Sequence, residues 1–351
     1  MPKLDTSQTT IIATGLEYPE GPIHCADGGT VLVEIKGKRL TYVAPDGTTT
    51  KLADVPEGPN GAAVGADGCI YICNDGGFDW IPIPPTNPFI WVAGNQPSNY
   101  TTGSLDRYDP STGTVETVFT EASKRQFPIG HDAPDWSPAY RLCGPDDLVV
   151  DEAGGIWVTD YGKIRERDKD ITGVYYVSPD GKTITQMVYP LNNPNGIALS
   201  PDGSKLYVAL TFERKVIYFD IAEPGVIKPN PSTLDGSYLL CADFVEQSVL
   251  DSMAVDQEGN VYVATMLPQG NVPNSQGGIS IVTPDGDVTF FELDLPDQSF
   301  NPLPSNICFG GEDMKTAFVT CGGSGHLISM PSEVPGLKLN FNGSAFSRAT
   351  S

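Results

Sequence analysis

Six polar residues recur at the same position of a segment that repeats along this chain of 351 residues. They are Glu20, Asn60, Asp146, Asn195, Asp251 and Ser305. All six side chains offer oxygen, three of them carry a carboxylate, and none is a histidine or a cysteine. Such oxygens are the ligands that Ca²⁺ takes in proteins, and Mg²⁺ and Mn²⁺ accept similar groups. The six residues therefore predict a divalent-cation site if the fold brings them together, and otherwise a polar, water-filled channel.

The repeated segment that carries these residues has the pattern of a β-hairpin. Its copies begin at Pro19, Pro59, Pro145, Pro194, Leu250 and Pro304. Each copy contains two short apolar runs joined by a tight turn, such as PDG or ADG. Proline fixes φ at the first turn position and glycine accepts positive φ, so these sequences favour hairpins. Most copies are followed by a second hairpin, for example GVYYVSPDGKTITQMV from Gly173.

Four strands in each of six copies are typical of an all-β, six-bladed β-propeller. We expect a single domain over residues 1–351, with a strand around residues 10–16 completing the last blade. The first strand of every blade lines the central channel, so the six oxygen-bearing residues should meet at one mouth of that channel. Carboxylates gathered there would have raised pKa values unless a cation compensated their charge.

Two insertions interrupt the regular spacing between the second and third copies. They span residues 78–102 and 121–140, are rich in proline and aromatic residues, and contain Trp80, Trp91 and Trp136. The second insertion leads directly into Asp146, so we expect both to cover the mouth where the six residues meet. As an alternative, the tryptophans plug the end of the propeller and only pack.

Composition excludes several classes of function. The chain has 21 Lys and Arg against 44 Asp and Glu, a net charge of −23, which would repel a nucleic acid. No apolar run approaches the roughly 18 residues of a membrane span, and the polar start MPKLDTSQTT does not indicate secretion. The seven cysteines are odd in number and form no CxxC, so neither a disulfide framework nor a zinc knuckle is expected. We predict a cytoplasmic protein, and the oligomeric state stays open.

Three motifs carry a resemblance to a known family. PEGP at Pro19, PNGIALSPDGSKLYV at Pro194 and LDSMAVDQEGNVYVAT at Leu250 resemble the senescence-marker-protein/gluconolactonase/luciferin-regenerating family of six-bladed propellers. The resemblance covers nearly the whole chain and implies a divalent ion bound by Glu20, Asn195 and Asp251. Many relatives have Asn-Asp where this chain has Asp146-Asp147, which makes the fourth ligand, Asp146, acidic. These two aspartates, Ser252 and the pair Ser305-Asn306 look more like the drug-responsive lactonase branch.

The expected chemistry follows from the charge of such a site. A divalent cation polarises a carbonyl and binds water while a neighbouring carboxylate takes the proton, which hydrolyses an activated ester. A lactone is the obvious substrate, with Asp251 as the first candidate base and Asp146 and Asp147 as the next. The residues expected to contact substrate are Asn60, Trp80, His131, Trp136, Ser305 and His326. An esterase or organophosphate hydrolase, and a noncatalytic binding propeller that uses its metal structurally, are the alternative functions.

Overall fold

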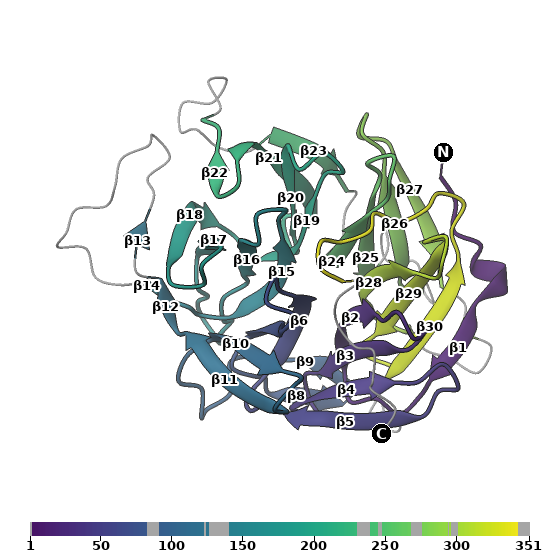
Figure 1. Cartoon of the computed structure of the whole chain (residues 1–351), viewed down its shortest axis with the longest axis horizontal. Coiled ribbons are helices and arrows are strands. Elements are labelled where there is room, and N and C mark those ends of the chain that lie inside the picture. Colours follow the sequence, from purple (N-terminus) through teal and green to yellow (C-terminus); the bar gives the residue numbers. More distant parts are fainter. Residues whose placement is uncertain are drawn as a thin grey trace.

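The computed structural model shows six β-sheets arranged as blades around a central axis (Figure 1). It describes residues 2–82, 91–122, 124–125, 140–229, 239–244, 248–267, 276–293, 295 and 301–342. This arrangement confirms the predicted six-bladed β-propeller. In the part of the chain so described, no helix is long and apolar enough to span a membrane.

The first three blades follow one another along the chain, each beginning with its innermost strand. Blade one has β2 (Pro19–His24), β3 (Thr30–Glu34), β4 (Arg39–Val43) and β5 (Thr49–Asp54). Blade two has β6 (Pro59–Val64), β7 (Ile70–Asn74), β10 (Ser104–Asp109) and β11 (Thr114–Phe119). Blade three has β15 (Pro145–Val150), β16 (Ile156–Asp160), β17 (Thr172–Val177) and β18 (Ile184–Leu191), and β13 (Lys124–Arg125) pairs with β18.

The last three blades repeat this order, and the N-terminal strand completes the ring. Blade four has β19 (Pro194–Leu199), β20 (Lys205–Leu210), β21 (Lys215–Glu223) and β23 (Leu239–Asp243), with β22 (Val226–Ile227) on the end of β21. Blade five has β24 (Val249–Val255), β25 (Val261–Leu267), β26 (Gly278–Val282) and β27 (Val288–Glu292). Blade six has β28 (Pro304–Gly310), β29 (Thr316–Cys321) and β30 (His326–Pro331), and β1 (Thr10–Ala13) pairs with β30 as its outer strand. The prediction that the N-terminal strand completes the last blade is confirmed.

Three small elements lie outside the blades. The short helical turn η1 (Thr6–Gln8) precedes β1. The pair β8 (Trp80–Pro82) and β9 (Trp91–Ala93) lies within the first insertion, and β12 (Glu121–Ala122) pairs with β14 (Tyr140–Arg141) at the two ends of the second.

The hydrophobic core is divided into six clusters, one between each pair of neighbouring blades. Between blades three and four, for example, Trp157 of β16 packs with Leu206 and Val208 of β20, and all three are fully buried. The inner strands of consecutive blades also contact one another, including β28 with β2, which closes the ring. Each blade thus buries both faces against its neighbours, which fixes the six inner strands around the channel.

Every inner strand loses its regular register just after it enters the blade. The irregularities lie between Glu20 and Ile23, Pro59 and Ala62, Pro145 and Leu148, Pro194 and Ile197, Leu250 and Met253, and Pro304 and Asn306. A β-bulge bends a strand and re-aims the side chain at that point. We call the six oxygen-bearing residues the ring residues. Five of them stand within these irregularities, and Glu20, which pairs with Val33, is the last regular residue before the irregularity in β2.

Glycine after a ring residue allows neighbouring inner strands to approach. A Cβ on Gly61 would lie 2.6 Å from the carbonyl oxygen of Asp146, and one on Gly196 would lie 2.7 Å from that of Asp251. Side chains do not fit at such distances, so the PNG motifs of blades two and four hold each ring residue close to that of the next blade.

Candidate functional site

The ring residues lie buried together at one mouth of the channel, the ring mouth. Asn60 Nδ2 is 3.3 Å from Asp146 Oδ2, which joins blade two to blade three. Asn306, which follows ring residue Ser305, donates from Nδ2 to Glu20 Oε2 at 2.7 Å and joins blade six to blade one. These contacts bring together residues that lie far apart in the sequence.

Three ring carboxylates share this buried mouth. Burial raises the pKa of Glu20 and of Asp146 well above the usual range, and the charge of Asp251 adds to both shifts. Burial raises the pKa of Asp251 to about 8, although the hydrogen bond with the Asn195 side chain opposes the shift. Like charges held together out of water disfavour one another's ionisation. The acids therefore favour their protonated forms unless a cation compensates their charge.

The donor set suits a hard cation. Glu20 Oε2 accepts hydrogen bonds from Asn306 Nδ2 and from the amide of Gly21, whereas the buried Oε1 has no hydrogen-bond partner among the described residues. Across the ring, Asn195 Oδ1 lies 3.4 Å from Ser252 Oγ. Within the described part of the chain, no three His, Cys, Asp or Glu side chains are grouped closely enough to form a metal site by themselves. A cation here would therefore draw on amide as well as carboxylate oxygens.

A buried ion pair that sequence reasoning missed supports the ring from blades two and three. Lys163 Nζ is fully buried and lies 3.1 Å from Asp75 Oδ1 and 2.7 Å from the carbonyl oxygen of Gly77. The other oxygen of Asp75 accepts a hydrogen bond of 3.2 Å from Asn60 Nδ2. The chain of contacts from Lys163 through Asp75 and Asn60 to Asp146 thus fixes the orientation of two ring residues. Asp75 directly follows β7 and Lys163 lies three residues after β16. These second strands end beside the ring, and that position is the signal that could have found both residues.

Aromatic side chains surround the same mouth. Burial raises the pKa of the Tyr18 phenol, and the charges of Asp251 and Glu20 raise it further, which locates Tyr18 beside the ring. The ring of Trp80 lies 4.9 Å from that of Tyr18, measured between centroids. Tyr161 also lies near the ring. Burial is the largest cause that raises the pKa of its phenol, and the charges of Asp146 and Asp251 are the next. Neither tyrosine was among the residues expected from the sequence.

The described part of the first insertion extends from blade two across the ring mouth. Trp91 donates from its amide to Gly323 of blade six at 3.4 Å, and Lys36 of blade one lies 4.4 Å from the centroid of the Trp91 ring. Gln96 donates from its amide to the carbonyl of Ile164 in blade three at 2.8 Å. The insertion therefore contacts three other blades on the side of the ring residues. Most of the second insertion, with His131 and Trp136, lies outside the described residues.

The other expected residues that the structure describes already have hydrogen-bond partners. Asp147 accepts hydrogen bonds from the amides of Leu148 at 2.9 Å and Ile197 at 3.3 Å, so both of its oxygens bind backbone. Ser305 Oγ donates to the carbonyl of Pro19 at 2.8 Å and joins blades six and one. His326 Nδ1 lies 2.9 Å from Ser324 Oγ, in the turn before β30. A role for Ser305 and His326 in substrate binding stays a prediction.

A known protein family matches this chain. The family model described as the SMP-30/Gluconolactonase/LRE-like region matches residues 18–323, which is most of the chain. The chain belongs to this family. This confirms the resemblance seen in the PEGP, PNG and LDS motifs.

The relatives differ in the share of their own length that this chain matches. A gluconolactonase of Zymomonas mobilis is 25% identical over 354 residues, which cover 91% of this chain and 82% of that protein. The lactonase drp35 of Staphylococcus haemolyticus is 27% identical over 256 residues, covering 72% of this chain and 64% of that one. The structure of regucalcin from Agrobacterium tumefaciens, described as a calcium-binding protein, has a TM-score of 0.63 at 17% identity over 94% of this chain and 97% of that chain. That likeness shows the shared fold.

The Lys163–Asp75 pair gives a first prediction. Replacing Lys163 with Met keeps an unbranched chain over the Phe78 ring but leaves Asp75 buried without its cation. We expect Lys163→Met to lower the free energy of unfolding by about 3–5 kcal/mol, the usual cost of breaking a buried pair. Urea denaturation measures this change. Lys182→Met, which removes a lysine whose side chain is 80% exposed, is the matched control and should leave stability unchanged. Equal stability of the two variants would contradict a structural role for the pair.

Proposed function

We propose that this protein is a divalent-metal-dependent hydrolase that opens a lactone ring. The observation that carries the proposal is the buried convergence of Glu20, Asp146 and Asp251 at the ring mouth, where Glu20 Oε1 lacks a hydrogen-bond partner among the described residues. Membership of a family that includes proteins named gluconolactonase and lactonase drp35 supports the reaction class.

Glu20, Asn195, Asp251 and Asp146 would hold the metal in this proposal. Their oxygens suit Ca²⁺, and the likeness in fold to a protein described as calcium-binding agrees with that choice. Mg²⁺ and Mn²⁺ are the alternatives, because carboxylate oxygens suit them as well. The bound cation would also compensate the mutual repulsion of the acids.

In this proposal, side chains of the protein accept the proton and orient one another for the reaction. A bound divalent cation supplies Lewis acidity toward an ester carbonyl. Asp251 takes the proton of the attacking water, and Asp146 is the next candidate, because its Oδ2 accepts only a long hydrogen bond of 3.3 Å from Asn60. Asp147 is the weakest of the three, because both of its oxygens accept backbone amides. Asn60, held by Asp75, orients Asp146 toward the mouth.

The substrate in this proposal is a small lactone, bounded by the aromatic residues above the ring. Trp80, beside Tyr18, forms an apolar wall next to a polar centre, a composition common in small-molecule pockets. We extend this role to residues 78–102 and 121–140 as a cover that selects the substrate. We also propose a cytoplasmic location, because all seven cysteines are free thiols, the state that a reducing compartment maintains.

Elemental analysis tests the metal. We expect protein purified without chelator to contain about one equivalent of calcium. Glu20→Gln removes a charged ligand and should weaken calcium binding by at least about tenfold in calorimetric titration. Glu116→Gln, which changes a side chain that is 65% exposed, should bind calcium as the parent does. Absence of any stoichiometric metal, together with no thermal stabilisation by added calcium, would reject the site.

Hydrolysis of a lactone panel tests the reaction. Activity that disappears with chelation and returns with calcium supports the proposal, whereas binding without turnover supports the noncatalytic propeller.

Asp251→Asn keeps an oxygen but cannot take a proton, so we expect turnover to fall by about 10²–10⁴-fold with metal retained. The control is Asp54→Asn, at a side chain that is 77% exposed. Loss of metal and activity together would leave Asp251 as a ligand only, and turnover close to that of the parent would exclude it as the base. Preference for simple esters or organophosphates over lactones would select the alternative enzyme class.

Substrate ranking tests the cover over the ring mouth. Trp80→Ala removes the side chain next to Tyr18, so the order of kcat/KM across lactones of different size should change while metal content stays constant. Leu240→Ala truncates an apolar side chain that is 54% exposed on the outer strand β23, away from the ring, and serves as control. An unchanged substrate order in Trp80→Ala would mean that this tryptophan only packs.

A further inference from the structure

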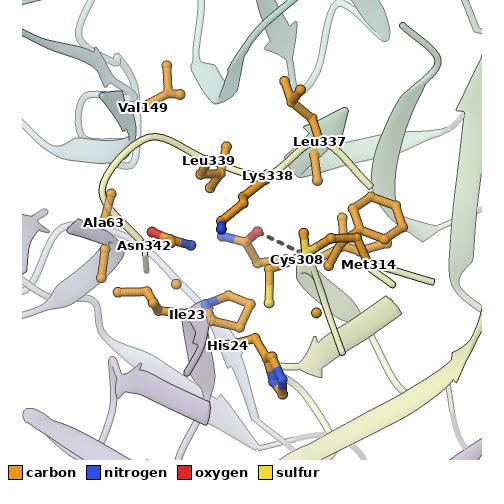
Figure 2. A pocket seen from close by; sticks show the side chains of 18 of the residues that line it. Ile23, His24, Ala63, Val149, Cys308, Met314, Leu337, Lys338, Leu339 and Asn342 are labelled. Carbon is orange, nitrogen blue, oxygen red and sulfur yellow. Dashed lines mark hydrogen bonds between the residues drawn. The ribbon is translucent and has the colours of Figure 1, made fainter. Parts of the chain in front are cut away.

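A second hollow occupies the channel on the far side of the ring residues (Figure 2). It measures about 560 Å³ and begins at the residues that directly follow ring positions, among them Gly21, Asp147 and Asn306. From there it extends past the ends of the inner strands, to Cys25 and Gly310. We call this hollow the lower chamber.

All six blades contribute an apolar side chain to the wall of the lower chamber. Three residues after each ring residue, the inner strands contribute Ile23, Ala63, Val149, Ala198, Ala254 and Cys308 to its lining. Figure 2 shows four of these side chains, Ile23, Ala63, Val149 and Cys308, around the hollow. The lining of the channel therefore changes from six oxygen-bearing side chains at the ring to six apolar side chains. The change takes three residues of each inner strand, or about 10 Å of extended chain.

The C-terminal segment of residues 337–342 crosses the opposite mouth and forms the remaining wall (Figure 1). Its Leu337 donates from its amide to the carbonyl of Val255 in blade five at 2.9 Å. Asn340 Nδ2 donates to the carbonyl of Val150 in blade three at 3.0 Å. Leu339 lies between these two anchors, lines the chamber and is 40% exposed. The segment thus spans the mouth from blade five to blade three.

Size and charge restrict what this chamber can hold. Protein interiors pack densely, and pockets for small ligands measure roughly 300–1,000 Å³, the range that includes this hollow. Cavities with apolar walls take up apolar molecules and not water. Three carboxyl groups, of Asp27, Asp147 and Glu312, and one amino group, of Lys338, also line the chamber, and the excess of acidic groups disfavours an anion.

We propose that the lower chamber is a second binding site, for a compact, uncharged, apolar molecule that enters from the face opposite the ring mouth. The site is built from the apolar ring of the inner strands and the C-terminal segment. None of its lining residues is a ring residue, and dye binding is measured without a lactone, so the test does not depend on the proposed hydrolysis.

Binding of the uncharged fluorescent dye N-phenyl-1-naphthylamine tests the chamber. We expect the full-length protein to give a saturable, blue-shifted emission with one dye per chain. Leu339→Asp introduces a charge at an exposed position of the chamber wall and should weaken dye binding at least fivefold. Leu240→Asp makes the same change on the outer strand β23 and should bind as the parent does. Ala254→Leu should weaken binding by filling the chamber, with Ala222→Leu on the exposed end of β21 as its control.

Lactone hydrolysis and thermal melting of each variant report whether it folds. Since Leu339 is exposed, Leu339→Asp should keep both properties of the parent even if Ala254→Leu does not fold. No saturable dye emission with the parent protein would overturn the proposal, as would a Leu339→Asp variant that binds dye as tightly as the parent. Loss of dye binding in Glu20→Gln but not in Leu339→Asp would locate the dye at the ring mouth, which also overturns it.

Discussion

The burial of several carboxyl groups at one mouth of the channel is the constraint on which the rest of this structure depends. Glu20, Asp146 and Asp251 come from three blades; burial raises the pKa of all three, and the charge of Asp251 raises the pKa of the other two further. No local interaction holds them together, and their charges oppose the arrangement. The six clusters between blades supply the opposing stabilisation, because each blade can bury both faces only when the ring is closed.

The backbone presents the ring residues by two recurrent devices. In five inner strands an irregularity takes the ring residue out of the regular ladder, and in β2 it begins directly after Glu20. The glycine that follows in the PNG motifs lets the next inner strand approach to a distance that any side chain would prevent. The same motif therefore provides both the amide oxygen and the close approach of strands, which explains why the residues occur together in the sequence.

Second strands and the loops after them form an outer layer around the ring mouth. Asp75 and Lys163 pair there across the boundary between blades two and three, and Tyr18 contacts the insertion of blade two through Trp80. These contacts connect the orientation of Asn60 and Asp146 to loops that carry no metal-binding motif. The opposite half of the channel is lined mostly by apolar side chains of the inner strands and by the C-terminal segment. One channel thus presents two chemically different ends.

The sequence by itself determined the repeated hairpins, the number of blades and the six ring residues. These features depend on turn chemistry and on spacing within one blade, which short segments of sequence contain in full. Only the tertiary structure decided that Lys163 pairs with Asp75, 88 residues away, and that the Ser305 hydroxyl joins two blades. It also decided that the ring of Tyr18 packs against that of Trp80. The physical reason is that loops of different blades meet only after the ring has closed. Their contacts are set by the curvature and closure of the whole propeller, and no local pattern of residues records them.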